Sequence, residues 1–333
     1  MLNGIKSQII LKNIFKNISK ITILRLIVYN KKLRSKLNIS INDYRNYANQ
    51  ILIEIIPKKE KRKIDFINRV GGKSFYHIYF NDSKERINRN YIYANENVSI
   101  IKVRIDSEVT SLFRLFENSA FNLSIKFIKF NRTNITDMSY MFSGCTSLIN
   151  LDIKLLKTDN VTDMRRMFSN CESLEELDLS NFKTHKVTDM SGMFSCCNSL
   201  RKLNLSSFKT KKVIDMDYMF YKCSSLKELN LSNFNTKKVT SMNDMFHYCS
   251  SLKILDLSNL KSDKLEKINN MFNECSSLES LYLQNFDTNK VKETEKIFYE
   301  CKALYYLEMP YNKKFDDIFK RTTCSIFGIC IIN

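Results

Sequence analysis

Hydrophobic positions recur every 26 residues between about residue 107 and residue 310, and nine of them define each copy. In a central copy they are Val213, Met216, Met219, Phe220, Cys223, Leu226, Leu229, Leu231 and Phe234. The positions from Met216 to Cys223 have the spacing of one helix face, whereas the two leucines around Asn230 alternate as in a half-buried strand. Each copy is therefore predicted to form a short helix, a tight turn, a strand and a second tight turn.

Polar residues precede the predicted helix in most copies. They are Thr136, Thr162, Thr188 and Thr240, with Asp137, Asp163, Asp189 and Asp215. Threonine and aspartate side chains accept hydrogen bonds from the first N–H groups of a helix, so these residues are predicted to be N-caps.

A fixed period of this length predicts a solenoid, because one copy cannot bury its apolar face without neighbours on both sides. The terminal copies depart from the pattern, as capping turns do. The first has Ser119 at the cysteine position, and the last has Thr294 and Ile297 at the methionine positions. About eight turns are predicted, which at the usual inter-strand spacing stack to roughly 40 Å.

The phrase L-x-x-L-x-L-x-x-F, at Leu200 to Phe208 for example, resembles a leucine-rich repeat. With V-T-D-M-x-x-M-F-x-x-C-x-S-L ahead of it, the repeat resembles the BspA-like repeats of bacterial surface proteins and some protists. The resemblance covers about 107–310 and implies a right-handed solenoid used for binding. The expected fold class is α/β, with an N-terminal helical segment and a small β cap beside the solenoid.

Cysteines form one of the repeated columns. Its members are Cys145, Cys171, Cys197, Cys223, Cys249, Cys275 and Cys301. They share the predicted inner helix face with methionine and phenylalanine, and the chain has no C-x2-C spacing, so small buried thiols are favoured over a metal site. Cys196 falls outside the column and is expected to face solvent. Ten mostly unpaired cysteines suit a reducing compartment, and no cofactor is expected.

The outward strand positions form the surface that leucine-rich repeats offer to partners, their concave face. The predicted partner-binding residues are Asp152, Glu176, Asp178, Asn204, Glu228, Asn230, Asp256, Tyr282, Tyr306 and Glu308. Tyrosine is enriched at interface centres, so Tyr282, Tyr305 and Tyr306 are candidate anchors. The alternative is that these tyrosines cover the C-terminal end of the stack.

A lysine column also recurs every 26 residues. It comprises Lys186, Lys212, Lys238, Lys264 and Lys290, with Lys211 and Lys237 beside it. Such a row can meet phosphates or an acidic partner, although many lysine columns are solvated and serve solubility.

The first 45 residues lie outside the repeat and have helical spacing. The string from Ile9 to Leu33 resembles an F-box, which implies docking on the small adaptor of cullin-type ubiquitin ligases. The positions that carry the resemblance are Leu11, Ile14, Phe15, Ile18, Leu24, Val28 and Lys31. The usual Leu-Pro opening is absent and the chain has no tryptophan, so a helical cap on the solenoid is the alternative.

The predicted organisation has four parts. Residues 1–45 form the F-box-like segment, 46–105 a small β element that caps the solenoid, 106–312 the solenoid, and 313–333 a C-terminal cap or tail. Strands are expected at Ile51 to Ile56, Tyr76 to Phe80 and Val98 to Ile105, which are rich in Ile, Tyr and Val.

The net charge of +18 is concentrated outside the repeats, since residues 1–70 hold sixteen Lys and Arg against four Asp and Glu. Nucleic acid is a usual partner of such charge, but the whole chain is rich in Ile, Asn and Lys, which disfavours that interpretation. The last four residues, Cys330 to Asn333, fit the C-a-a-X prenylation pattern apart from the final Asn, so a membrane role depends on lipidation of Cys330. An apolar end that covers the last repeat is the alternative.

No apolar run reaches transmembrane length and no signal peptide is recognisable, so a cytoplasmic protein is expected. The histidines His77, His185 and His247 are scattered, and no catalytic constellation is present. The sequence therefore predicts a non-enzymatic protein-interaction scaffold, with a substrate receptor of a cullin-type ligase as its most specific form. The alternative is a surface or secreted BspA-like adhesin.

Overall fold

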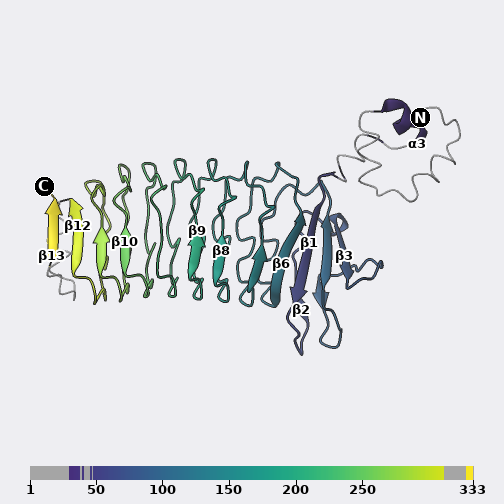
Figure 1. Ribbon diagram of the computed structural model, residues 1–333, viewed down its shortest axis with the longest axis horizontal. Coiled ribbons are helices and arrows are strands. Elements are labelled where there is room, and N and C mark those ends of the chain that lie inside the picture. The colour runs from purple at the N-terminus through teal and green to yellow at the C-terminus, as the bar shows by residue number, and fades with distance from the viewer. Residues whose placement is uncertain (1–29, 38–39, 41–45, 47, 311–327, 333) are drawn as a thin grey trace.

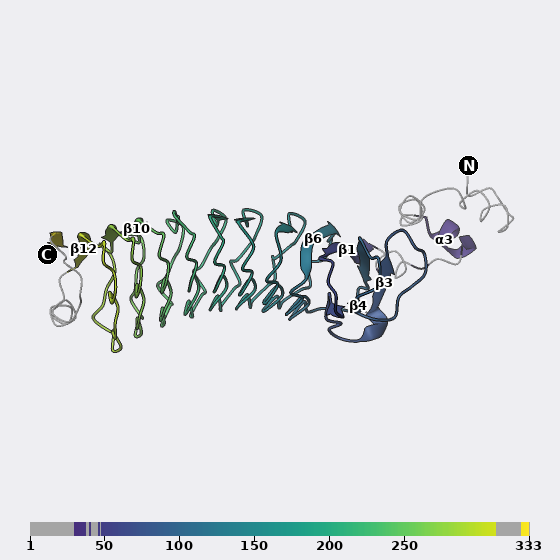
Figure 2. The ribbon, with the colours of Figure 1, turned by 90° about the horizontal axis from the view of Figure 1, so that it is seen from below.

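The structure is a computed structural model, and it describes residues 30–37, 40, 46, 48–310 and 328–332. Its main body is a β-solenoid whose turns stack along a nearly straight axis (Figure 1 and Figure 2). No helix in the described part of the chain is long and apolar enough to cross a membrane.

Seven turns are linked by a column of parallel bridges that runs from Asp137 to Glu293. The degenerate copy before them joins the stack through the N–H of Leu112, which donates to the carbonyl of Asp137 at 3.0 Å. Most turns contribute one short strand to a second column. These strands are β7 (Asn150–Asp152), β8 (Glu176–Asp178), β9 (Lys202–Asn204), β10 (Ile254–Asp256), β11 (Ser280–Tyr282) and β12 (Tyr306–Pro310). The 26-residue period is thus one turn of the solenoid, as predicted.

The predicted helix in each copy is wrong, and with it the α/β class. The segment from Met138 to Cys145 is a run of tight turns in which N–H groups alternate between two partners. Met141 N–H donates to Met138 three residues back, whereas Phe142 N–H donates to Met167 in the next turn. Tyr140 and Gly144 have φ of 56° and 74°, and left-handed residues recur at these two positions in the following turns. A right-handed helix cannot contain such residues, so Thr136 and Asp137 do not cap one.

These Thr and Asp side chains instead tie the turns together. Thr162 Oγ1 donates to the carbonyl of Thr136 at 3.2 Å, and Thr188 repeats the contact with Thr162. Asp137 and Asp163 accept the backbone N–H two residues ahead, at 2.9 and 3.0 Å. The polar columns therefore satisfy turn backbone rather than helix ends.

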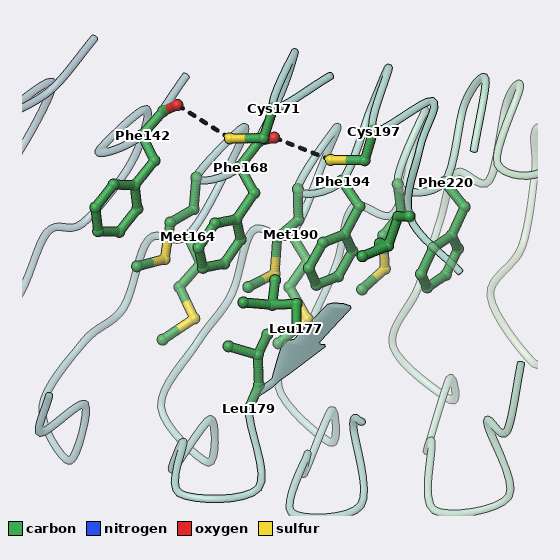
Figure 3. Close-up of a cluster of buried hydrophobic side chains, with 14 of the residues drawn as sticks. Phe142, Met164, Phe168, Cys171, Leu177, Leu179, Met190, Phe194, Cys197 and Phe220 are labelled. Atoms are coloured by element: carbon green, nitrogen blue, oxygen red, sulfur yellow. Dashed lines mark hydrogen bonds between the residues drawn. The ribbon is translucent and has the colours of Figure 1, made fainter. Parts of the chain in front are cut away.

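Three side-chain ladders fill the core (Figure 3). The phenylalanine ladder, Phe116, Phe142, Phe168, Phe194, Phe220, Phe246, Phe272 and Phe298, stacks its rings nearly parallel at 5.5–5.7 Å between centroids. Each cysteine of the predicted column is buried, and its thiol donates to a phenylalanine carbonyl of the preceding turn, as Cys171 does to Phe142 at 3.3 Å. The buried methionines lie beside both. The prediction of small buried thiols is confirmed.

An antiparallel sheet closes the N-terminal end of the solenoid. It contains β1 (Ile51–Pro57), β3 (Tyr76–Phe80), β5 (Ile101–Ile105) and β6 (Asn122–Lys129), in the order β3-β5-β1-β6-β7. β6 pairs antiparallel with β1 and parallel with β7, so the sheet passes directly into the strand column of the solenoid. The short strands β2 (Ile64–Asp65) and β4 (Tyr91–Ile92) pair with each other, and the 3-10 helix η2 (Lys73–Phe75) precedes β3. Strands β1, β3 and β5 lie where the sequence predicts strands.

Of the predicted N-terminal helices, the structure describes only α3 (Lys31–Leu37). The residues proposed to dock an adaptor, Leu11, Ile14, Phe15, Ile18, Leu24 and Val28, lie outside the described residues. At the other end, β13 (Gly328–Ile332) pairs in parallel with β12, and Cys330 is opposite Glu308. The chain end thus adds a strand to the last repeat.

Candidate functional site: the strand face

The outward positions of the strand column form one continuous surface, which we call the strand face. Seven of the ten predicted partner-binding residues have half or fully exposed side chains on β7 to β10 or on the turn between β9 and β10, and the other three lie on β11 and β12. Because the turns stack along a nearly straight axis, this face is close to flat in Figure 2, without the marked concavity that the resemblance implies.

The third residue of each strand, which is its second outward position, is largely Asp or Asn, and these side chains close the turn after the strand. Asp178 accepts the backbone N–H of Ser180 at 3.0 Å, and Asn230 accepts that of Ser232 at 3.0 Å. The N–H of Ser180 also holds the pKa of Asp178 below its usual range. These side chains therefore have a structural role in the turn, in addition to any contact with a partner.

Charged side chains at the first residue of a strand, or one residue before it, pair across turns. Lys202 Nζ lies 2.5 Å from Glu176 Oε1, and Lys253 Nζ lies 3.1 Å from Glu279 Oε1. Both pairs are exposed, so each contributes little stability, but they neutralise the face locally.

The strand column is interrupted at residues 228–230, which form no strand. Within residues 48–310, no backbone hydrogen bond joins 228–230 to β9 or to β10. A groove of about 690 Å³ opens at this interruption, lined by Lys227, Glu228, Leu229, Asn230, Leu231, Ser232, Lys253, Ile254, Asp256, Ser258 and Asn259. Ile254 is 59% exposed beside it and is the most exposed large apolar side chain among the described residues. Sequence reasoning missed this groove, and placed Glu228, Asn230 and Asp256 on the same face only as part of a uniform stripe.

The candidate tyrosine anchors lie on the two turns that follow β10. The rings of Tyr282 and Tyr306 are 5.3 Å apart between centroids and both side chains are half-buried, whereas Tyr305 is 54% exposed. β12 lies between β11 and β13, so Tyr306 is not at the end of the stack. The position of Tyr306 therefore does not support the alternative that these tyrosines cover the C-terminal end of the stack.

An aromatic cluster that the sequence analysis missed lies on the turns that carry the cysteine column. Tyr221 contacts His247 edge-on at 5.2 Å between centroids, and His247 stacks on Tyr248 at 4.4 Å. The ammonium of Lys222 lies 5.3 Å from the centroids of both tyrosine rings. The sequence did contain a signal for this cluster. At the positions of Tyr221 and His247, other copies of the repeat have small or polar residues, such as Ser195 and Asn273.

Two partly buried carboxylates lie two residues apart, since Asp215 is in the bridge column and Asp217 follows it. Burial raises the pKa of Asp215 and of Asp217. The neighbouring carboxylate of Asp217 raises the pKa of Asp215 further, and the carboxylate of Asp244 raises the pKa of Asp217 further. Asp217 accepts hydrogen bonds from the Ser241 hydroxyl at 2.5 Å and the Asn243 backbone N–H at 2.6 Å. Asn243 accepts the N–H of Asn269 in the same way, so an Asn fits the position of Asp217.

Asp217→Asn is therefore expected to stabilise the fold at neutral pH. A raised pKa in the folded chain means that stability is greatest below the unfolded pKa of about 3.9 and is lost as pH rises through the folded pKa. Asn keeps the acceptor and removes the charge, so the melting temperature should exceed that of the wild type at neutral pH, and the difference should shrink in acid. The control is Asp178→Asn. The pKa of Asp178 is lowered in the folded chain, so this carboxylate contributes stability above the unfolded pKa. A melting temperature for Asp217→Asn that falls at neutral pH would contradict this account.

Among the described residues, no group of three or more His, Cys, Asp or Glu side chains is arranged to hold a metal ion. Cys196 is half-exposed, as predicted, and the seven column cysteines are buried.

Comparison with known proteins gives one family. Residues 107–229 and 198–310 match the family described as Mycoplasma protein of unknown function, DUF285, which together span more than half of the chain. No curated protein matches the chain. Among solved structures, the crystal structure of a TLR13–ssRNA13 complex matches at 16% identity and a TM-score of 0.24, over 53% of this chain and 31% of that chain. The chain thus spans about a third of that protein.

Proposed function

We propose that this chain, which belongs to the DUF285 family, is a non-enzymatic scaffold that binds a protein partner through the groove at residues 228–230 of the strand face. The observation that carries the proposal is the interruption of the strand column beside Ile254, an exposed apolar side chain rimmed by charged and amide groups.

The groove has the composition of a protein-binding centre. Interfaces place an apolar anchor inside a polar rim, and burial of one such side chain is worth roughly 1.5–3 kcal/mol. Here Ile254 is the anchor, and Lys227, Glu228, Asn230 and Asp256 supply the rim. Neither Lys227 nor Glu228 has an ion pair within the described chain, in contrast to Lys202 and Lys253 on either side. Their charges are therefore available to a partner.

The backbone strengthens this assignment. Residues 228–230 have no ladder partner on either side, so their N–H and C=O groups are open to hydrogen bonds from a bound segment. Between β8 and β9, and from β10 to β13, these groups are used within the stack. An exposed segment that adds main-chain hydrogen bonds to a strand column is a common mode of peptide recognition.

Ile254→Asp is expected to abolish capture of the partner from a lysate of the source organism by the immobilised intact chain. The matched control is Ile149→Asp, because Ile149 is 53% exposed on the same face but lies outside the groove. Loss of the anchor should weaken binding by tenfold or more, since about 1.4 kcal/mol corresponds to a factor of ten. Equal effects of the two substitutions on the captured proteins would overturn the assignment.

The more specific form of the proposal is a substrate receptor of a cullin-type ubiquitin ligase. It rests on the F-box-like positions Leu11, Ile14, Phe15, Ile18, Leu24 and Val28. In the same experiment, a Leu11→Asp, Phe15→Asp variant should lose a cullin and its small adaptor while it retains the partner held at Ile254. If the wild-type chain captures no cullin, this form of the proposal fails and the solenoid assignment stands.

We also propose residence in the cytoplasm. The seven column cysteines act as S–H donors to main-chain carbonyls, which requires reduced thiols. The competing proposal is a surface adhesin of the BspA type. Labelling of the chain by an impermeant reagent on intact cells would favour the adhesin and contradict the cytoplasmic assignment.

A further inference from the structure

Seven lysines gather on three consecutive turns of one edge of the solenoid, and we call this set the basic edge. It comprises Lys209, Lys211, Lys212, Lys237, Lys238, Lys261 and Lys264. They lie on the turns after β9, after residues 228–230 and after β10, along the edge toward which the strand arrows point in Figure 1. All seven are exposed, and the edge segments that carry them, residues 206–213, 232–239 and 258–265, contain a single acidic residue, Asp263.

Among the described residues, the lysines of the basic edge have no carboxylate partner, whereas four exposed lysines elsewhere on the solenoid do. Lys202, Lys253, Lys267 and Lys292 each lie within 3.1 Å of a glutamate in an adjacent turn. In the described part of the chain, no ion pair and no side-chain hydrogen bond involves the ammonium group of any lysine of the basic edge.

A buried threonine ladder holds the edge turns at a fixed spacing. Thr184 Oγ1 donates to the carbonyl of Lys209 at 3.2 Å and accepts its N–H at 2.7 Å. Thr210 makes both contacts with Asn235, and Thr236 donates to the carbonyl of Lys261 at 2.8 Å. All three threonines are fully buried. The lysines therefore project from a rigid row whose turns repeat at about the 5.6 Å spacing of the phenylalanine rings.

The shape of the edge decides which polyanion it fits. Proteins that bind single-stranded nucleic acid combine a groove with exposed aromatic rings on which bases stack. The aromatic residues beside the basic edge, Phe208 and Phe234, are buried. The edge is a straight outer row, so all of its ammonium groups can approach a flat anionic surface together.

We propose that the basic edge binds membranes that contain acidic phospholipids, with the solenoid axis parallel to the bilayer. Each lysine near such a surface strengthens binding several-fold, and the effect fades within a Debye length, so binding should be lost at high salt. The strand face and its groove are a separate surface, so this inference does not depend on the proposed partner.

The test is co-sedimentation of the full chain with vesicles of phosphatidylcholine, with or without about a third phosphatidylserine. The edge variant replaces Lys211, Lys212, Lys238 and Lys264 by Gln. The control variant replaces Lys202, Lys253, Lys267 and Lys292 by Gln, which changes the net charge equally. We expect the edge variant to lose about 100-fold or more in partition to the acidic vesicles and the control variant to lose less than tenfold.

Residues 1–70 are also basic, so the difference between the two variants is the readout, rather than binding of the wild type. Melting temperatures close to that of the wild type ensure that both variants are folded. Equal losses in the two variants would overturn the proposal, as would failure of the wild-type chain to bind acidic vesicles. Tighter binding of the wild type to single-stranded RNA or to polyglutamate than to the vesicles, lost in the edge variant alone, would also overturn it.

Discussion

Phe220→Ala is expected to lower the free energy of unfolding by about 3–5 kcal/mol, enough to unfold much of a marginally stable chain. Phe220 is fully buried, and its ring lies 5.6 Å from those of both Phe194 and Phe246. Its carbonyl accepts the thiol of Cys249. In a solenoid each turn contacts only its neighbours, so a cavity in a central turn weakens the interfaces on both sides. Urea unfolding of the purified chain measures the change.

Two controls isolate the role of ring stacking. Phe220→Leu keeps an apolar side chain of similar volume and should cost less than about 1.5 kcal/mol. Phe116→Ala should cost less than Phe220→Ala, because Phe116 stacks on only one ring, that of Phe142. A loss below about 1 kcal/mol for Phe220→Ala would show that the phenylalanine ladder does not hold the turns together.

Cys196 is expected to react with a thiol reagent at least about 100-fold faster than any column cysteine in the native chain, because the column must unfold before it reacts. Burial raises the pKa of the column thiols from Cys145 to Cys275, to about 12 for Cys197 and for Cys275. Each is also held as a donor to a carbonyl, whereas Cys196 is half-exposed. Time-resolved alkylation followed by peptide mass spectrometry gives the rate at each cysteine.

A Cys196→Ser variant supplies the control for this measurement. It should remove the fast phase assigned to Cys196 and leave the rates of Cys197 and Cys223 unchanged. Denaturant should raise the column rates to that of Cys196. Fast native alkylation of Cys223, which lies in the middle of the stack, would contradict the buried ladder.

The sequence was sufficient to predict which side chains lie inside. Met216, Met219, Phe220 and Cys223 are buried as their spacing predicts. The same spacing led to the incorrect prediction of a helix. The spacing indicates which positions face the core, but it does not indicate how the backbone N–H groups are hydrogen-bonded. A run of turns with left-handed residues at two fixed positions orients the same side chains inward. A signal was present, since Gly, Asn and Asp recur at these positions, at Gly192 and Asn270 for example, but Tyr218 and Lys222 there hide it.

The candidate site was predicted only as a surface. Alternation around Leu229 placed Glu228 and Asn230 outward, and the structure agrees. The interruption of the strand column could not be predicted, because Glu228-Leu229-Asn230 differs from β9 by only its first residue. Whether a short strand keeps its ladder depends on the registration of both neighbours, which one sequence does not display.

The most direct test of the account is photo-crosslinking in cells of the source organism, with a photoreactive amino acid at position 254, 149 or 218. Position 254 is at the groove, and position 149 is on the same face outside it. Tyr218 contacts Tyr221 of the aromatic cluster and lies outside the groove. The account predicts a discrete protein adduct from position 254 that is weak or absent at the other two. An adduct of the same protein that forms equally at 149 and 218, with none at 254, would contradict it.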